Sequence, residues 1–339
     1  MENIIRREAR TTAIQHNKFM VLLKGKQQVP KETWTGSTNL SDGGIHGQTN
    51  VGHWLRNADV ADRFLAYWTL LSEDPGASDG DESASVRAKN AALRAAVEAI
   101  NEVPASIEDI APGVTPVFSP RTGKTILNLY FDLIDSAETS GFITLAFGVN
   151  KDFKTKLVEH TSDSQIVFLL LEKKDEAKAN AKDPFVALDA TNNVYQAFGS
   201  FLNEPIYQWA RETNARKLEL NQHVSYIHSK FLLRDPLGKD PIVVTGSANF
   251  SVASTNENDE NMLIIRGDQR VADIYFTEFN RLFNHYYFRA VHQTTSATGT
   301  GDVEASLFLD EDDKWLKKYK PGKLKQKRLD LYTGMKGFA

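Results

Sequence analysis

The sequence contains no cysteine among its 339 residues. This absence excludes disulfide bonds and thiolate metal sites, and it fits a reducing compartment. No apolar run approaches the roughly 18 residues that a membrane-spanning helix requires. The opening residues, MENIIRREAR, carry charges where a signal peptide would have its apolar core. We therefore expect a cytoplasmic protein without integral membrane association.

Basic residues are also slightly fewer than acidic ones. The chain has 40 Lys and Arg against 44 Asp and Glu, a formal net charge of −4 at pH 7. It therefore has no global attraction to polyanions, and any affinity for nucleic acid or anionic lipid must come from local patches. The content of 41% hydrophobic and 25% charged residues is typical of a soluble globular protein long enough for two domains.

Two short motifs, HxK and GSxN, each occur twice and in the same order. The four stretches are HNKFMVLL at 16–23, HSKFLLRD at 228–235, TGSTNLS at 35–41 and TGSANFS at 245–251. His16 lies 23 residues before Asn39, and His228 lies 21 residues before Asn249. Either motif alone is common by chance. Their joint recurrence at matching spacing indicates an internal duplication.

The second copy has the pattern of a complete α/β unit, from about 115 to 290. The predicted strands are FITLAFGV, QIVFLLLE, YIHSKFLLR and PIVVTG, with a helix at KDFKTKLVEH. Strand side chains alternate, so His228 and Lys230 should share one face of a buried strand. The first copy has only 15 residues before His16 and lacks the early strands. Either the chain is the C-terminal portion of a longer protein, or a shortened first sheet packs on the second.

The remaining segments are connections and a basic tail. Helices are predicted at 52–71 and 86–103 around a polar loop at 72–85, and a flexible link at 293–302. Residues 314–328 then hold eight Lys or Arg interleaved with two aromatic residues. Such a tail could bind phosphates and stack bases, or it could be a solvated extension. We divide the chain into a first half at 1–110, a second half at 111–292, and a linker with the tail at 293–339.

The paired motifs resemble those of the phospholipase D superfamily, whose signature is HxKxxxxD followed by GSxN. The second copy matches in full, at His228, Lys230, Asp235, Ser247 and Asn249. The first copy matches at His16, Lys18, Ser37 and Asn39. It has Leu23 where the second has Asp235, and we expect that aspartate to be structural. The resemblance implies an α/β fold of two pseudo-twofold related sandwich units, with mixed sheets flanked by helices and the first unit N-terminally incomplete.

Phosphodiester cleavage explains these residue types, because cations and hydrogen-bond donors must surround the phosphate oxygens as charge accumulates. Lys18 and Lys230 supply the charge. The predicted substrate-binding residues are Ser37, Asn39, Asn50, Ser247 and Asn249. We expect neither metal nor other cofactor, since two lysines are in place and His46 and His53 have no carboxylates near them to complete a metal site.

The two histidines suit nucleophilic and acid–base roles because an imidazole is neutral or protonated near physiological pH. In enzymes of the resembled superfamily, each histidine is oriented by the opposite half. Carried over, Glu260 would support His16 as the nucleophile, and Asn50 would face His228 as the general acid. A carboxylate stabilises an imidazole that becomes positively charged, which favours this assignment.

The sequence thus predicts a metal-independent phosphodiesterase that acts through a phosphohistidine. Nucleic acid is the favoured substrate, because NDEN at 258–261 resembles the N-x-E-N of the superfamily's small bacterial nucleases and the tail is basic and aromatic. Two alternatives stay open: a phospholipid headgroup hydrolase or phosphatidyltransferase, and a degenerate, non-catalytic phosphate-binding module. The oligomeric state, the strand preference and the mode of cleavage are not specified by the sequence.

Overall fold

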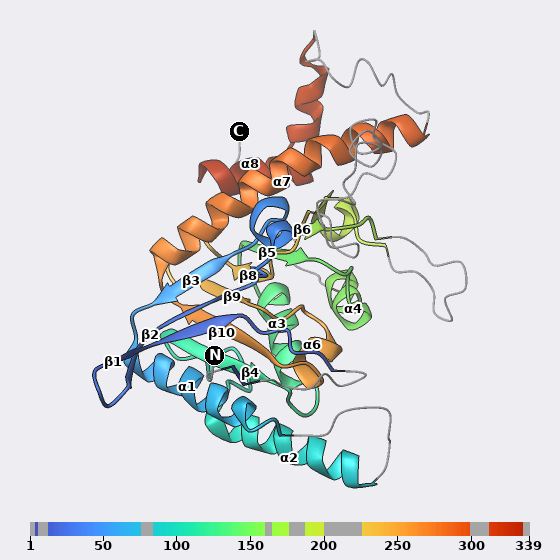
Figure 1. Cartoon of the computed structure of the whole chain (residues 1–339). Coiled ribbons are helices and arrows are strands. Elements are labelled where there is room, and N and C mark those ends of the chain that lie inside the picture. The colour runs from blue at the N-terminus through green and yellow to red at the C-terminus, as the bar shows by residue number, and fades with distance from the viewer. Residues whose placement is uncertain are drawn as a thin grey trace.

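A computed structural model of the chain describes residues 4–5, 13–75, 84–159, 165–175, 187–199, 226–298 and 312–334. Two β-sheets form its framework (Figure 1). The small sheet is antiparallel, with the order β1 (Phe19–Lys24), β2 (Val29–Gly36), β3 (Gly52–Leu55). The large sheet has the order β4-β10-β9-β8-β5-β6-β7. Its strands are β4 (Gly113–Ser119), β5 (Ser140–Leu145), β6 (Ile166–Leu171), β7 (Val194–Phe198), β8 (Phe231–Arg234), β9 (Ile242–Gly246) and β10 (Glu260–Arg266).

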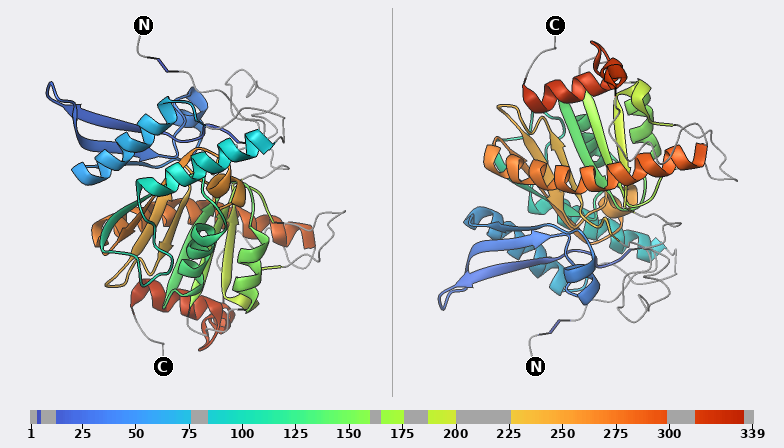
Figure 2. Two further views of the ribbon diagram at one scale, coloured as in Figure 1. Left: turned by 90° about the horizontal axis from the view of Figure 1, so that it is seen from below. Right: turned by 90° about the horizontal axis from the view of Figure 1, so that it is seen from above.

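The large sheet is mixed, as predicted, since β5, β6 and β7 are parallel and its other pairings are antiparallel. Helices cover both of its faces. The described helices of the chain are α1 (Ala58–Ser72), α2 (Ala84–Ile100), α3 (Thr125–Asp135), α4 (Lys151–Glu159), α6 (Val252–Asn256), α7 (Gln269–Thr298) and α8 (Leu324–Thr333), with short helices η1 (Gly43–Gly47), η2 (Ala190–Asn192) and η5 (Asp313–Tyr319). Figure 2 shows α3 and α4 on one face and α7 crossing the other.

Alternation along the strands divides the core between these two faces. Phe231 and Leu233 of β8 point to the cluster that includes α7, whereas Leu232 between them points to the cluster that includes α3 and α4. Every residue of β5 and β6 is buried, because helices cover both faces of the sheet there. The α/β prediction is therefore confirmed, with helices flanking a mixed sheet.

The two halves of the chain share a core. Tyr67 of α1 stacks on Phe118 of β4 with ring centroids 4.5 Å apart, and its hydroxyl donates to the carbonyl of Ser119 at 2.7 Å. The boundary at residue 110 stays a prediction. The meander β1-β2-β3 has the same strand order and antiparallel pairing as β8-β9-β10, and both begin directly after an HxK motif.

Four sequence predictions need correction. Both HxK motifs lie just before β1 and β8 rather than inside a strand. The helix predicted at 52–71 begins only at Ala58, because residues 52–55 pair with β2 and the side chain of Asn57 caps α1. The link at 293–302 is helical as far as Thr298, and residues 299–302 lie outside the described residues. The basic tail, for which no helix was predicted, contains η5 and α8.

In the part of the chain that the structure describes, no helix is both long enough and apolar enough to span a bilayer.

Candidate active site

The two motif histidines meet where the small sheet contacts the large one. The ring centroids of His16 and His228 lie 6.3 Å apart, with an interplanar angle of 71°. The convergence expected from the duplication is thus present, although the two residues are 212 positions apart in the sequence.

Backbone contacts between the copies fix this meeting, and each contact occurs twice. A parallel bridge joins Gln15 to Asp259, and the corresponding bridge joins Thr49 to Ile227. As a result, the amide of His16 donates to the carbonyl of Asp259 at 3.1 Å. The amide of His228 likewise donates to the carbonyl of Thr49 at 3.2 Å. Each histidine is therefore held by a segment that belongs to the other copy.

A carboxylate orients the first histidine. Nδ1 of His16 lies 2.9 Å from both carboxylate oxygens of Glu260. Glu260 is fully buried, and it also accepts a hydrogen bond from the hydroxyl of Ser247 at 2.7 Å. A carboxylate only accepts, so Nδ1 of His16 carries the proton and Nε2 keeps a lone pair.

An amide orients the second histidine in the same way. Nδ1 of His228 lies 2.8 Å from Oδ1 of Asn50, which also accepts from the hydroxyl of Ser37 at 2.9 Å. The amide nitrogen of Asn50 donates to the carbonyl of Gly44 at 2.7 Å, and this bond fixes which end of the amide faces the imidazole. Both cross-copy contacts implied by the superfamily resemblance are present, one charged and one neutral.

The glycine and serine of each GSxN motif build the turn beside these partners. A Cβ atom on Gly36 would lie 2.1 Å from the carbonyl oxygen of Val51, and one on Gly246 would lie 2.3 Å from that of Asn261. Only glycine permits this approach. The following hydroxyl, of Ser37 or Ser247, accepts the amide of Val51 or Asn261 at 3.0 Å in both copies.

The two lysines lie beside the histidines, Lys230 buried and Lys18 partly buried. Lys18 donates to the carbonyl of His16, and Lys230 donates to that of His228 at 2.6 Å. Burial lowers the pKa of Lys18 to about 8, although Glu260 acts in the opposite direction. The pKa of Lys230 falls well below its ordinary value, because the side chain is fully buried and Lys18 lies near. Both lysines therefore favour an anion in the site.

The same surroundings keep His228 neutral. Burial, followed by the charges of Lys230 and Lys18, lowers the pKa of His228 to about 2. A phosphodiester anion between the two lysines would oppose both charge effects and raise that pKa. An anion in the site would therefore favour protonation of His228.

Asp235 lies outside this group, and its carboxylate contacts the chain that enters β5. Its carboxylate accepts the amides of Glu138, Thr139 and Ser140 at 2.9, 2.7 and 3.1 Å, and the hydroxyl of Thr139 at 2.9 Å. These bonds fix the chain that enters β5, the neighbour of β8. Within the described residues, β1 has no strand on the corresponding side, which explains how Leu23 can occupy the aspartate position.

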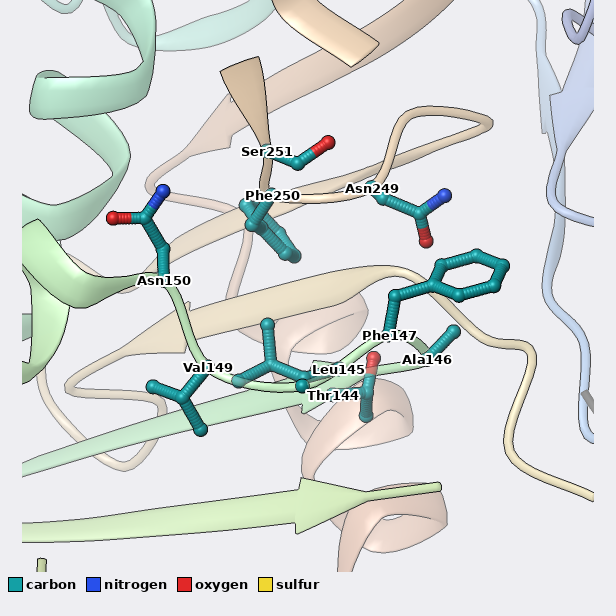
Figure 3. A pocket seen from close by; sticks show the side chains of 10 residues that line it. Thr144, Leu145, Ala146, Phe147, Val149, Asn150, Asn249, Phe250 and Ser251 are labelled. Carbon is teal, nitrogen blue, oxygen red and sulfur yellow. The ribbon is translucent and has the colours of Figure 1, made fainter. Parts of the chain in front are cut away.

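The asparagines of the two GSxN motifs lie in the turns after β2 and β9. Asn249 lines a cavity of about 140 Å³ between the loop after β5 and the start of α6. Figure 3 shows its side chain beside the ring of Phe147, which is 64% exposed. Oδ1 of Asn249 is buried and makes no hydrogen bond within the described residues. Asn39 occupies the matching turn, packed against Gly44.

Two positioning residues were missed by the sequence prediction. Glu172 is fully buried and accepts the amide of Ile227 at 2.6 Å, directly before His228. The hydroxyl of Thr144 donates to the carbonyl of Ser229 at 2.7 Å and accepts the amide of Phe231 at 3.0 Å. A charged residue that ends the otherwise apolar run QIVFLLLE was the available signal for Glu172.

Of the two other histidines considered from the sequence, His46 is an exposed residue of η1, and His53 packs on α7. His53 lies in β3, stacks on Tyr275 at 5.6 Å and bonds the hydroxyl of that tyrosine at 3.1 Å. Burial lowers the pKa of His53, opposed by Asp268. Across the described ranges, no group of three or more His, Cys, Asp or Glu side chains is arranged to hold a metal ion.

Part of the chain matches a known protein family, and solved structures resemble its fold. Residues 130–283 match the family described as "Cardiolipin synthase, PLD-like domain", a segment that includes the second copy only. No curated protein matches the chain in sequence. Similar solved structures include Nuc from Salmonella typhimurium, titled a phospholipase D family member, with 20% identity over 51% of this chain and 95% of that chain and a TM-score of 0.34.

Two further structures are similar at comparable levels. NucT from Helicobacter pylori has 16% identity over 50% of this chain and 95% of its own, with a TM-score of 0.35. Phosphatidylserine synthase from Haemophilus influenzae Rd KW20 has 12% identity over 91% of this chain and 70% of its own, with a TM-score of 0.45. Likeness at these levels does not distinguish among substrates. The family match identifies residues 130–283 as a PLD-like domain, and the first HxK and GSxN pair repeats its motifs outside that segment.

Proposed function

We propose that the protein is a metal-independent phosphodiesterase that acts through a phosphohistidine intermediate, with nucleic acid as its substrate. The observation that carries this proposal is the exchange of partners between the copies. His16 contacts Glu260 and His228 contacts Asn50, with the two imidazoles 6.3 Å apart. A single phosphate between the rings could meet both Nε2 atoms.

In the first step, Nε2 of His16 attacks phosphorus, and the bond from phosphorus to the leaving oxygen breaks. His228, protonated when the anion binds, gives its proton to that oxygen. The imidazole of His16 gains positive charge as the P–N bond forms, and the buried carboxylate of Glu260 stabilises this charge. Lys18 and Lys230 balance the charge on the non-bridging oxygens.

In the second step, neutral His228 takes a proton from water, and the resulting hydroxide attacks phosphorus. The P–N bond breaks and His16 is restored. Because Asn50 carries no charge, His228 can gain and lose its proton within one cycle. The difference between Glu260 and Asn50 thus supports His16 as the nucleophile. The proposed substrate-binding set is Ser37, Asn39, Asn50, Ser247 and Asn249, of which Ser37, Asn50 and Ser247 also position the histidines or Glu260.

Nucleic acid is supported by the exposed ring of Phe147 beside Asn249, since an aromatic face can stack a base next to the phosphate. A lipid phosphodiester is the second candidate. It is favoured by exposed apolar side chains on the small sheet, where Met20 is 53%, Leu22 41% and Trp54 59% exposed. Retention of both histidines with their partners argues against a module that only binds phosphate.

A substrate panel in EDTA tests the proposal. Single-stranded DNA, duplex DNA, RNA and phosphatidylcholine vesicles are compared at one pH, with His228→Ala as the inactive protein. His285→Ala is the matched control, because His285 is an exposed histidine on α7. We expect cleavage of nucleic acid that survives EDTA and is lost only with His228. Cleavage of vesicles alone would establish the lipid candidate, and no turnover of any phosphodiester would favour the binding module.

A further inference from the structure

The basic segment near the C-terminus is folded onto the large sheet. Leu324 and Leu331 of α8 pack against the core cluster on the α7 side. Arg328, between them, lies within cation–π distance of five rings. Its guanidinium carbon is 5.1 Å from the ring centroid of Tyr195, 5.4 Å from Tyr287, 5.6 Å from Tyr332, 5.8 Å from Phe168 and 5.9 Å from Phe283. These contacts hold α8 on the sheet, whereas η5 has no buried residue.

A cavity of about 440 Å³ opens beside this arginine, between β7, α7, η5 and α8. Its walls are mainly aromatic and cationic. The residues that matter for its chemistry are Tyr195, Tyr287, Tyr319, Tyr332, Lys325 and Arg328. Figure 2 shows α8 at the end of the large sheet away from the small sheet, so this cavity is separate from the paired histidines.

The cavity has polar groups on its inner wall. Tyr195 is only 5% exposed, and its buried hydroxyl lies beside the guanidinium of Arg328. Arg328 donates from Nη2 to Oδ1 of Asn284 at 2.7 Å and forms no ion pair with a described carboxylate. A guanidinium carries five N–H donors, so Arg328 can also donate to the phosphate of a ligand in the cavity.

The rim of the cavity extends the positive charge outward. Lys325 lies 5.7 Å from the ring centroid of Tyr319. Four exposed lysines of the same segment have no ion-pair partner among the described residues: Lys317, Lys318, Lys320 and Lys323. Stacking rings next to a row of cations are the combination that binds single strands, because bases are accessible only when unpaired.

We propose that this cavity is a second binding site, for a nucleotide unit of single-stranded nucleic acid, remote from the catalytic histidines. A base stacks among the tyrosines, and its phosphate meets Arg328 and Lys325. The neighbouring lysines then contact the following phosphates. The site would hold a polymer on the protein whether or not cleavage occurs, so it goes beyond the proposed function and can be tested without it.

The test is fluorescence anisotropy with labelled oligo(dT), on full-length His228→Ala protein so that the ligand stays intact. Lys325→Glu and Tyr319→Ala should each weaken binding at least about fivefold, as expected for loss of one stacking or phosphate contact. Lys314→Glu is the matched control. It makes the same charge change on the same segment, but Lys314 does not line the cavity and pairs with Asp312. For Lys314→Glu we expect less than a twofold change in affinity for oligo(dT). All three variants should keep the melting temperature of the His228→Ala protein.

Three results would overturn the proposal. One is an equal loss in Lys314→Glu, which would mean a diffuse basic surface. Another is equal affinity for duplex DNA, or binding only to vesicles that contain phosphatidylserine. The third is competition by free dTMP at the same concentration of nucleotide units, which would identify a mononucleotide site. Failure here leaves the cleavage assay with wild-type protein unaffected, so the two proposals fail separately.

Discussion

The carboxylate of Glu260 contacts Nδ1 of His16 through both oxygens at 2.9 Å, from the opposite copy of the duplicated motif. The corresponding position opposite His228 is held by an amide. This difference breaks the symmetry of an otherwise duplicated site. One imidazole has a fixed negative partner and the other does not, so the two histidines differ in how well each tolerates positive charge.

The asymmetry predicts which histidine becomes phosphorylated. With a slow substrate, His228→Ala should accumulate phosphate that is labile to acid and stable to alkali, because the general acid and base is missing while His16 still attacks. His16→Ala should accumulate none. The measurement is acid and alkali treatment of protein labelled with ³²P, followed by peptide mapping. Label at His228 in the His16 variant would reverse the roles.

The pKa of Lys18 predicts a pH limit. The lysine is charged below its pKa of about 8, so kcat/KM should fall as the pH rises through that value in the free enzyme. Glu260 raises this pKa, and its neutral analogue Glu260→Gln should therefore move the alkaline limb to lower pH as well as reduce activity. The check is a kcat/KM profile of both proteins between pH 6 and pH 10. If the alkaline limb of the kcat/KM profile is the same in Glu260→Gln, deprotonation of Lys18 is not its cause.

Replacement of Lys230 should stabilise the protein while it abolishes turnover. Lys230→Met keeps a long apolar side chain and removes a charge whose burial lowers its pKa well below 10.5. We expect a gain of about 1–3 kcal/mol in the free energy of unfolding at pH 7.

The wild type binds fewer protons folded than unfolded between the lowered pKa and 10.5, so its stability rises with pH in that window. The advantage of Lys230→Met should shrink as the pH approaches 10.5. Urea unfolding at two pH values measures both effects. A less stable variant would show that contacts of Lys230 that methionine cannot make outweigh the cost of burying its charge.

The sequence alone predicted the part of the candidate site that is built from the duplicated motifs. Two copies of HxK and GSxN predicted that His16 and His228 meet, and the resemblance supplied Glu260 and Asn50 as their partners. It did not predict that HxK precedes the strands, because the alternation of apolar residues continues through both motifs. The contacts of Glu172 and Arg328 were also not predicted. They depend on which backbone amides or aromatic rings lie opposite each side chain, and a single charged residue in a sequence does not specify that.

Asp235 allows a test of why the two copies differ. Asp235→Ala would leave the buried amide of Ser140 and the part-buried amides of Glu138 and Thr139 without this acceptor, and should destabilise the protein by about 1–3 kcal/mol. Leu23→Asp restores the superfamily pattern in the first copy, but no described strand there offers amides to it. We expect Leu23→Asp to give no gain in stability or kcat, measured by urea unfolding and by turnover at low temperature. A gain would mean that β1 has a partner like β5 in solution.

Phe147 distinguishes nucleic acid from other substrates at the catalytic site. If a base stacks on its exposed ring, Phe147→Leu should lower kcat/KM about tenfold for thymidine 5′-(p-nitrophenyl phosphate), mainly through KM, whereas Phe147→Tyr should retain activity. Methyl p-nitrophenyl phosphate has the same leaving group and no base, so the two variants should treat it alike. The leucine keeps the apolar character of the side chain and removes only the aromatic face. Equal losses on both substrates would show that Phe147 shapes the cavity around Asn249, and the preference for nucleic acid would then depend on other residues.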